Sequence, residues 1–428
     1  MAPTARLLFG VLPLYTQLVT QVLTRAGRGL TGTYPALGYR GFRLYWGGTV
    51  VSLTGFWMQA LAQGWLVLEL TNSPMMLGLV GGAWAAPNIA LSLIGGVVAD
   101  RVDRRRLLMA TRSVGVVASL STALLIATEL IQVWHVFAFA LLMGAVTAFD
   151  MPSSQAFVPS LVQQKHLMNA IALVSAAFNG TRIVGPSLAG VLIARFGVGG
   201  CYLISGLAAL TMILALAAIK APTTTTSKDG HLLAHVREGL AYVRRDELRM
   251  TLLAMVLVNS LFGMAYPAMM PVVARDVLAA GPQGYGALMS ADGLGSLAGT
   301  LVVASLRGLP RLGPVALASS AAFGVGLIGF ALSQELRLSL ALMTAVGFAN
   351  ATYGTLVNTL LQSKLDDEFR GRVLSVLSLV MSTMPLAGLQ AGALTTAFGA
   401  AFSLTLNGAV VIVASLAVAL FVPRLRQV

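Results

Sequence analysis

The stretch that decides the fold is Gly96-Val97-Val98-Ala99-Asp100-Arg101-Val102-Asp103-Arg104-Arg105-Arg106. It lies between two long apolar runs, at residues 76–99 and 107–127. Six of the seven residues from Asp100 to Arg106 are charged, and such a run is too costly to place in hydrocarbon. We therefore expect a tight turn at a membrane surface between two transmembrane helices. The four arginines of the turn indicate the cytoplasmic side.

The composition supports a membrane protein. Of the 428 residues, 57% are apolar and only 10% are charged, whereas a soluble protein carries about a quarter of charged residues. Twelve helical spans of about 20 residues would occupy roughly 240 positions. The apolar runs are much longer than the roughly 10 residues of a membrane-barrel strand. The sequence therefore predicts an all-α membrane protein.

The net charge of +13 has a distribution that argues against a nucleic-acid partner. Most of the lysines and arginines fall in the tails and even-numbered loops of a twelve-span arrangement, while Arg195, Arg275 and Arg337 fall in odd-numbered loops. This asymmetry predicts that both termini are cytoplasmic and that the basic surface faces anionic lipid headgroups. The single cysteine, Cys201, excludes an internal disulfide.

The apolar segments predict twelve transmembrane helices in two six-helix bundles, at residues 44–69, 76–99, 107–127, 132–151, 169–194, 200–219, 249–273, 284–305, 313–333, 338–362, 372–397 and 401–422. The expected organisation is an N-terminal segment (1–43), a first bundle (44–219), a cytoplasmic linker with an amphipathic stretch (220–247), a second bundle (248–422) and a tail (423–428). For the N-terminal segment, an amphipathic helix on the membrane surface and an unstructured extension both stay open. Gly190, Phe196 and Gly197 recur 202 residues later, and Gly78 recurs 208 residues later as Gly286, which favours two repeats.

The charged turn resembles the loop between helices 2 and 3 of the major facilitator superfamily, whose pattern is Gly-x-Leu-Ala-Asp-Arg-x-Gly-Arg-Lys. Gly96, Ala99, Asp100, Arg101 and Arg104 match this pattern. Arg105 replaces the lysine, Val98 the leucine and Asp103 the second glycine. Gly96 is expected to let two helices approach closely.

Further stretches resemble the enterobactin-exporter-like and macrolide-efflux-like branch of that superfamily, at residues 42–48, 57–59, 70–74, 150–156 and 370–373. The resemblance covers about residues 40 to 422. It implies the major facilitator fold and a multi-pass transporter of a bacterial inner or plasma membrane, without a cofactor and acting as a monomer.

Two charged residues lie deep within the predicted spans. Arg182 lies about 20 Å from the inner end of its span, and Asp292 about 12 Å from the outer end of its own, at 1.5 Å per residue. In a core about 30 Å thick their depths nearly coincide, so we expect them to pair. For Arg182, a fixed ion pair between helices and an anion-binding or gating group both stay open. For Asp292, a structural partner and a protonatable group that couples transport to protons both stay open.

Three further residues are candidates for conformational roles. Gly185 and Pro186 resemble part of the antiporter motif of drug exporters, where the proline is expected to bend the helix against a neighbour. Asp150, at the inner end of span 4, corresponds to an acid that pairs in the family with the arginine matching Arg104. We expect it to act as a conformational latch.

The resemblance also implies that spans 1, 4, 7 and 10 line a substrate cavity. The candidate residues on these spans are aromatic or carry amides, and each has packing or an interhelical hydrogen bond as its alternative role: Trp57, Gln59, Gln63, Asn259, Tyr266, Asn350, Tyr353 and Asn358. Such a lining suits an amphipathic compound.

The function that we expect is proton-coupled export of a small amphipathic compound, of the drug or siderophore class, by alternating access. Uptake of a polar metabolite and a sensor that transports nothing are the alternatives. The sequence contains no HExxH, GxSxG or Walker A pattern, so it predicts neither an enzyme nor a metal site. The expected partners are the substrate, protons and membrane lipids.

By the resemblance, Asp100 lies near the start of helix 11, at residues 371–373, in the outward-facing state, where a helix N-terminus favours negative charge. Asp100→Asn should therefore shift the population toward the inward-facing state and impair transport, while the protein still inserts into the membrane. Transport in sealed vesicles and labelling from the cytoplasmic side test this prediction. Unchanged values of both would refute it.

Overall fold

The structure is a computed structural model that describes residues 34–219, 240–244, 246–305, 311–363 and 365–428. The expectations for residues 1–33 and for the linker at 220–239 lie outside these residues. Between residues 34 and 219 the chain forms five α-helices: α3 (Arg40–Thr71), α4 (Pro74–Arg101), α5 (Arg104–Ala127), α6 (Val133–Phe157) and α7 (Leu167–Ala218). It also forms three short 3-10 helices: η2 (Pro35–Gly38), η3 (Val158–Leu161) and η4 (Gln164–His166).

From residue 246 onward the described chain is again helical. The elements are α9 (Glu247–Leu261), η5 (Gly263–Ala265), α10 (Tyr266–Val272), the π-helical turn η6 (Val273–Val277), α11 (Gly281–Ser305), α12 (Leu312–Leu332), α13 (Leu336–Ser363), α14 (Asp367–Met381), α15 (Met384–Phe398), α16 (Ala400–Phe421) and α17 (Pro423–Arg426). No strand occurs in the part of the chain that the structure describes. The all-α prediction is therefore confirmed.

The helices are long and apolar enough to cross a membrane. Within the described ranges, 10 helical runs meet that condition, and one of them, Gln164–Ala218, is 55 residues long. That run contains two predicted spans, because α7 leaves helical geometry at Gly197. Helix α3 is not among the 10, but its 32 residues are about 48 Å long at 1.5 Å per residue. The arrangement is consistent with twelve spans.

The charged turn at residues 100–106 joins the end of α4 to the start of α5. Asp103 is the N-cap of α5, and its carboxylate accepts a hydrogen bond from the Arg106 backbone N–H at 2.8 Å. A capping carboxylate satisfies an N–H that has no partner within the helix. This explains why an aspartate can replace the glycine of the family pattern at this position.

The two halves repeat the same local structure. Gly197 interrupts α7 with φ 69° and ψ 177°, and Gly399 separates α15 from α16 with φ 86° and ψ 162°. Positive φ strains any residue that has a Cβ, so both sharp turns depend on glycine. The recurrence at an offset of 202 residues is therefore structural.

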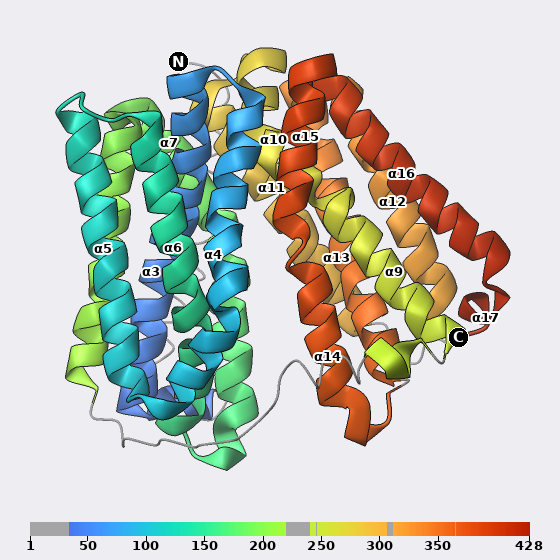
Figure 1. The fold of residues 1–428 in the computed structure, drawn as a ribbon, viewed down its shortest axis with the longest axis horizontal. Coiled ribbons are helices and arrows are strands. Elements are labelled where there is room, and N and C mark those ends of the chain that lie inside the picture. Colours follow the sequence, from blue (N-terminus) through green and yellow to red (C-terminus); the bar gives the residue numbers. More distant parts are fainter. Residues whose placement is uncertain (1–33, 220–239, 245, 306–310, 364) are drawn as a thin grey trace.

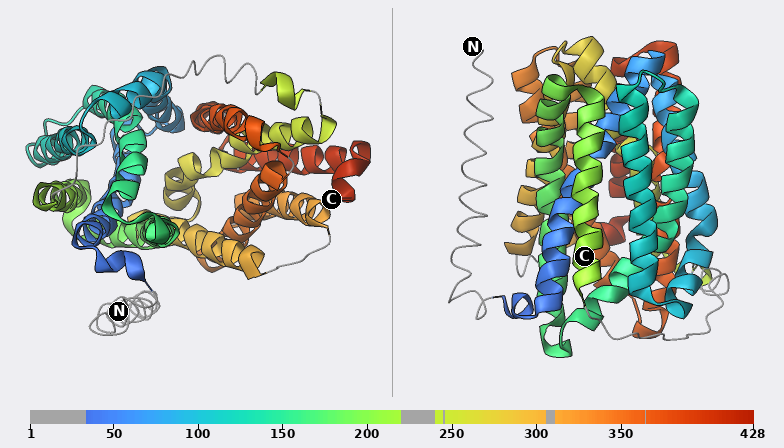
Figure 2. Two further views of the ribbon diagram at one scale, coloured as in Figure 1. Left: turned by 90° about the horizontal axis from the view of Figure 1, so that it is seen from below. Right: turned by 90° about the vertical axis from the view of Figure 1, so that its left-hand side faces the viewer.

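The helices form two groups that lie side by side, α3–α7 and α9–α16 (Figure 1). We call the end of the molecule at the Arg101–Arg106 turn the basic end, and the end at residues 72–73 and 128–132 the distal end. The groups approach each other at the distal end, at the top of Figure 1, and diverge toward the basic end. Figure 2 shows the two groups from the basic end as well.

Small residues bring the two groups together at two helix pairs, α4–α15 and α7–α11. A Cβ built at Gly190 in α7 would lie 2.7 Å from the Pro282 carbonyl oxygen in α11, and one built at Gly392 in α15 would lie 2.8 Å from that of Pro74 in α4. Any side chain at these positions would separate the groups. Both contacts lie in the distal half.

The expected close approach at Gly96 is wrong. A Cβ at Gly96 would meet nothing within 4 Å, whereas one at the neighbouring Gly95 would overlap the Ala148 carbonyl of α6. Adjacent helix positions point about 100° apart, as 3.6 residues make a turn. The packing glycine of this segment is therefore Gly95.

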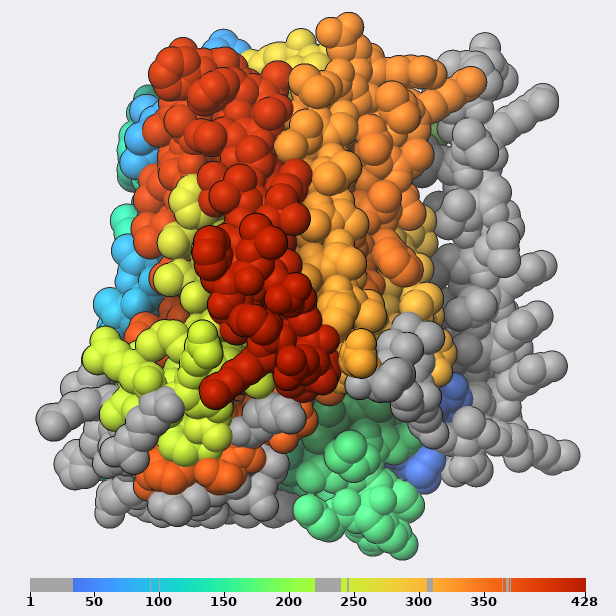
Figure 3. Space-filling model, turned by 90° about the vertical axis from the view of Figure 1, so that its right-hand side faces the viewer, coloured from blue at the N-terminus to red at the C-terminus, as the bar shows by residue number. Residues whose placement is uncertain are grey.

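The outer surface of the second group is apolar, as expected for contact with lipid tails. Helices α12 and α16 lie next to each other across one face (Figure 3). Their exposed side chains include Val325, Leu332, Val413, Leu416 and Leu420.

The C-terminal residues pack near the start of α12. Leu425 is fully buried, and the Gly313 N–H donates to the Val428 carbonyl at 2.7 Å.

Candidate functional site

The two deep charges are in contact. The Arg182 guanidinium of α7 donates to the Asp292 carboxylate of α11 with Nη2 and Oδ2 2.8 Å apart. The Tyr266 hydroxyl of α10 donates to Oδ1 of the same carboxylate, also at 2.8 Å. The Asp292 side chain is 1% exposed, while that of Arg182 is 26% exposed. Arg182 and Asp292, which were expected to lie at similar depths and to pair, thus form a direct ion pair between the two groups of helices. The role of this ion pair in transport stays a prediction.

The local backbone explains how Tyr266 reaches this carboxylate. Helix α9 ends at Leu261, and α10 begins at Tyr266 after a short 3-10 turn in which Met264 is non-helical. Pro267 follows in the first turn of α10, where a proline costs no helix hydrogen bond. The break places the tyrosine at the start of α10, beside Asp292.

Around the pair, α7 and α11 pack closely. A Cβ at Gly293 would lie 3.0 Å from the Ile183 side chain, and the Ser187 and Ser290 hydroxyl oxygens are 2.6 Å apart. Ser290 also donates to the Ile183 carbonyl at 2.7 Å. The interface is therefore polar as well as tight.

The residues of the antiporter-like motif lie in the same helix. A Cβ at Gly185 would lie 2.5 Å from Cβ of Trp57 in α3, so this glycine sets the spacing of α3 and α7. The φ/ψ angles of α7 stay helical at Pro186 and leave helical values at Gly197, so the expected bend at Pro186 stays a prediction. The Pro186 carbonyl faces Gly286 of α11.

Asp150 has a different partner from the one expected. Its carboxylate is 2.6 Å from Nη2 of Arg112 and accepts a hydrogen bond from the Thr111 hydroxyl at 2.8 Å. Arg104 lies eight residues before Arg112 on α5, about 12 Å along the helix, and donates to the Ala156 carbonyl at 3.4 Å. The pairing that the family suggested is corrected to Arg112.

Arg112 was not predicted as a site residue. The signal was available, because this arginine falls inside the predicted span at 107–127, where a charge needs a partner. The neighbouring Arg105 has another role, as it donates to the carbonyls of Leu216 and Ala217 at 2.6 and 2.8 Å. It thereby satisfies carbonyls at the C-terminus of α7. Arg101 is exposed at the end of α4.

A cavity of about 360 Å³ lies between the two groups of helices. Aromatic rings contribute much of its lining, from Phe56, Trp84, Phe139 and Tyr285, and its amides are those of Gln59 and Gln63. No charged side chain lines it. Gln59 accepts a hydrogen bond from Ser119 at 3.0 Å. Gln63 has no hydrogen-bond partner among the residues that the structure describes, so its amide is available to a ligand.

The other predicted cavity residues lie elsewhere. Trp57 packs edge-on against Phe56 and Phe178, and Tyr266 binds Asp292. Asn259 donates to Asn350 at 3.3 Å. Tyr353 is 2% exposed in the core of the second group, and Asn358 accepts from Gln362 at the basic end of α13. These helices are apolar on most sides. The sequence therefore predicted how deep each residue lies along its helix but not the direction in which its side chain faces.

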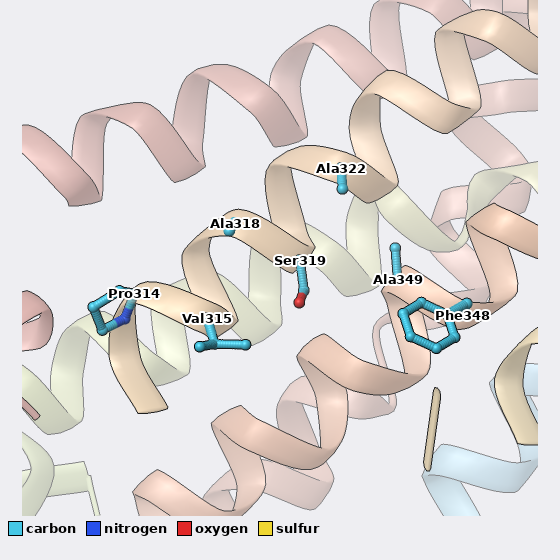
Figure 4. Close-up of a pocket in the computed structure, with 7 residues that line it drawn as sticks. All are labelled: Pro314, Val315, Ala318, Ser319, Ala322, Phe348 and Ala349. Atoms are coloured by element: carbon cyan, nitrogen blue, oxygen red, sulfur yellow. The ribbon is translucent and has the colours of Figure 1, made fainter. Parts of the chain in front are cut away.

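A second hollow, of about 420 Å³, lies between α12 and α13. Its lining comprises Pro314, Val315, Ala318, Ser319, Ala322, Phe348 and Ala349 (Figure 4). Ser319 supplies the only side-chain hydroxyl of that lining. Its apolar character fits a surface depression facing lipid tails.

Two repeated groups of membrane-spanning helices, packed at one end and separated at the other around a central cavity, define a membrane transporter of the major facilitator superfamily. The family model described as MFS_3, transmembrane secretion effector, matches residues 31–428. The chain belongs to this family. The resemblance to the exporter branch is thereby confirmed.

Relatives and solved structures agree with this assignment. The chain is 24% identical to the staphyloferrin A transporter of Staphylococcus aureus, over 83% of this chain and 89% of the relative. It is 27% identical to the multidrug efflux pump Tap of Mycolicibacterium fortuitum, over 85% and 91%. A bacterial homologue of the human lysosomal transporter Spinster, solved in an inward-facing and unoccupied conformation, matches with a TM-score of 0.71 at 13% identity, over 88% of this chain and 96% of that chain.

The ion pair between the groups predicts a specific pattern of stabilities. Arg182→Gln or Asp292→Asn alone should each destabilise the protein by about 2 kcal/mol, because one charged group then loses its partner. The double variant should cost less than the sum of the two, by about 1 kcal/mol or more. Thermal unfolding of the detergent-solubilised protein measures the cycle. Strictly additive losses would show that the two charges are not coupled.

Proposed function

We propose that this protein exports a small amphipathic compound from the cytoplasm and that the export is coupled to proton entry. The observation that carries the proposal is the uncharged, aromatic cavity between two repeated helix groups. The relative Tap, a multidrug efflux pump, supports the direction and the substrate class.

We assign the basic end to the cytoplasm. The arginines at this end include Arg101, Arg104, Arg105 and Arg106, whereas the described distal end has Arg195, Arg275 and Arg337. The positive-inside rule then places both chain ends in the cytoplasm. In this orientation the helix groups separate on the cytoplasmic side, which is the side from which an exporter loads its substrate.

The lining of the cavity favours one kind of compound. Burial of a multiply charged substrate would need opposite charges, and the lining has none. Aromatic faces accept planar rings and delocalised cations, while the Gln63 amide can donate to or accept from a polar group. The expected substrate is therefore an aromatic or polycyclic compound that is neutral or carries a single delocalised charge.

Transport of ethidium by the reconstituted protein tests this function. Proteoliposomes with an imposed pH gradient should accumulate ethidium, and dissipating the gradient should stop accumulation. Gln63→Leu should raise KM about 5- to 30-fold, because a hydrogen bond to a ligand is worth about 1–2 kcal/mol. Gln427→Leu, which removes an exposed amide of the C-terminal tail, is the matched control and should leave KM unchanged. Equal effects of both substitutions, or no gradient-driven flux, would contradict the proposal.

A further inference from the structure

The two interfaces between the helix groups are equivalent by the internal repeat but differ in chemistry. A Cβ at Gly286 of α11 would overlap the Pro186 carbonyl of α7, and one at Gly78 of α4 would overlap the Gly388 carbonyl of α15. These four residues correspond through the offsets of 208 residues for α4 and α11 and 202 residues for α7 and α15. The α7–α11 and α4–α15 interfaces are thus two versions of one contact.

Equivalent positions in the two interfaces have different side chains. The hydrogen-bonded Ser187 and Ser290 of the α7–α11 interface correspond to Leu389 and Gly82, where a Cβ at Gly82 would lie 3.3 Å from the Leu389 side chain. Arg182 corresponds to Met384, and Asp292 to Trp84. One interface is therefore polar and contains an ion pair, whereas the other is apolar at the same four positions.

We propose that Asp292 is the proton-binding site that couples protons to the conformational cycle, and that it acts on the α7–α11 interface alone. This inference rests on the proposed function and deepens it. The charged or titratable groups that face Asp292 among the described residues are Arg182 from α7 and Tyr266 from α10, while α13 presents the Gly347 backbone. The apolar α4–α15 interface offers no proton-binding group at the corresponding positions.

The proposed step is the transfer of one proton to Asp292, with no other covalent bond formed or broken in the protein. A proton from water binds the Asp292 carboxylate and replaces the hydrogen bond from Arg182, which stays protonated. Water reaches the pair on the Arg182 side, because that side chain is partly exposed and a charge facing hydrocarbon would be too costly. The interface changes from net neutral to a net charge of +1, and an unpaired arginine favours hydration over tight packing.

Coupled exchange requires that the empty transporter changes conformation only when a proton is bound, and the loss of the ion pair meets this requirement. With Asp292 charged, the ion pair bridges the two groups and opposes separation of α7 from α11. The protein without proton or substrate then stays in the conformation described here. Protonation removes the bridge and lets the distal side open, so that movement of the empty transporter needs a proton.

Distances between spin labels test the conformational part without any substrate. Cys201 is the only cysteine, so Cys201→Ser gives a background for labels at exposed positions. Leu130 and Leu332 report the distal end, and Met168 and Gln362 report the basic end. Lowering the pH from 8 to 5 should increase the distal-open population of the otherwise unmodified protein several-fold.

The variants decide which group responds. Asp292→Asn and Arg182→Gln should give the same distance distribution at both pH values, because neither can form the ion pair. Met384→Gln, at the position equivalent to Arg182, and Asp246→Asn, in the Arg249–Asp246 ion pair, should keep the pH response. A response that persists in Asp292→Asn, disappears in Asp246→Asn, or is missing from the unmodified protein would overturn the proposal.

Ethidium flux separates this inference from the proposed function. Asp292→Asn should retain downhill ethidium movement and lose at least 10-fold of the stimulation by an imposed pH gradient. Gradient-driven flux that is unchanged in Asp292→Asn would overturn the coupling role while leaving export standing. Absence of flux in every variant, together with a pH response that depends on Asp292, would instead refute the proposed function alone.

Discussion

The structure depends on a buried carboxylate that requires an ion-pair partner and hydrogen bonds. Asp292 is almost fully buried between helices, and a buried charge is tolerated only when it is paired and hydrogen-bonded. Its two oxygens are bound by Arg182 and Tyr266, which come from two other helices. Three helices are therefore held to one point by one side chain. Because α7 belongs to the first group and α10 and α11 to the second, the same contact also joins the groups.

Close packing makes that contact possible. An arginine and an aspartate on facing helices meet only if the helix axes approach closely, and the small residues of α7 and α11 allow this. The same small-residue pattern occurs between α4 and α15. The repeat therefore fixes the geometry of both interfaces, and the side chains at four equivalent positions decide what each interface does. Such a division lets one interface change its function without altering the fold.

The sequence predicted the fold much better than the site. Hydropathy and charge located the spans, and the recurrence of Gly197 as Gly399 identified the repeat. Depth along the helix also brought Arg182 and Asp292 together. The direction in which each side chain faces around the helix axis could not be predicted, because these helices are apolar around most of their circumference. For this reason Trp57 and Tyr353 were assigned to a cavity that neither lines. Arg112 was missed for a different reason, since its position inside the predicted span already marked it as a charge that needs a partner.

The break between α9 and α10 connects the site to the rest of the second group. A broken helix leaves backbone carbonyls without partners, which is costly within a membrane. The Leu261 carbonyl at the break accepts a hydrogen bond from the Gln390 amide of α15 at 3.4 Å, and Gln390 also contacts Asn407 of α16. The break that positions Tyr266 on Asp292 is thus supported by a partly buried amide from another helix. The same hydrogen bond connects the break to α15, the helix that packs against α4.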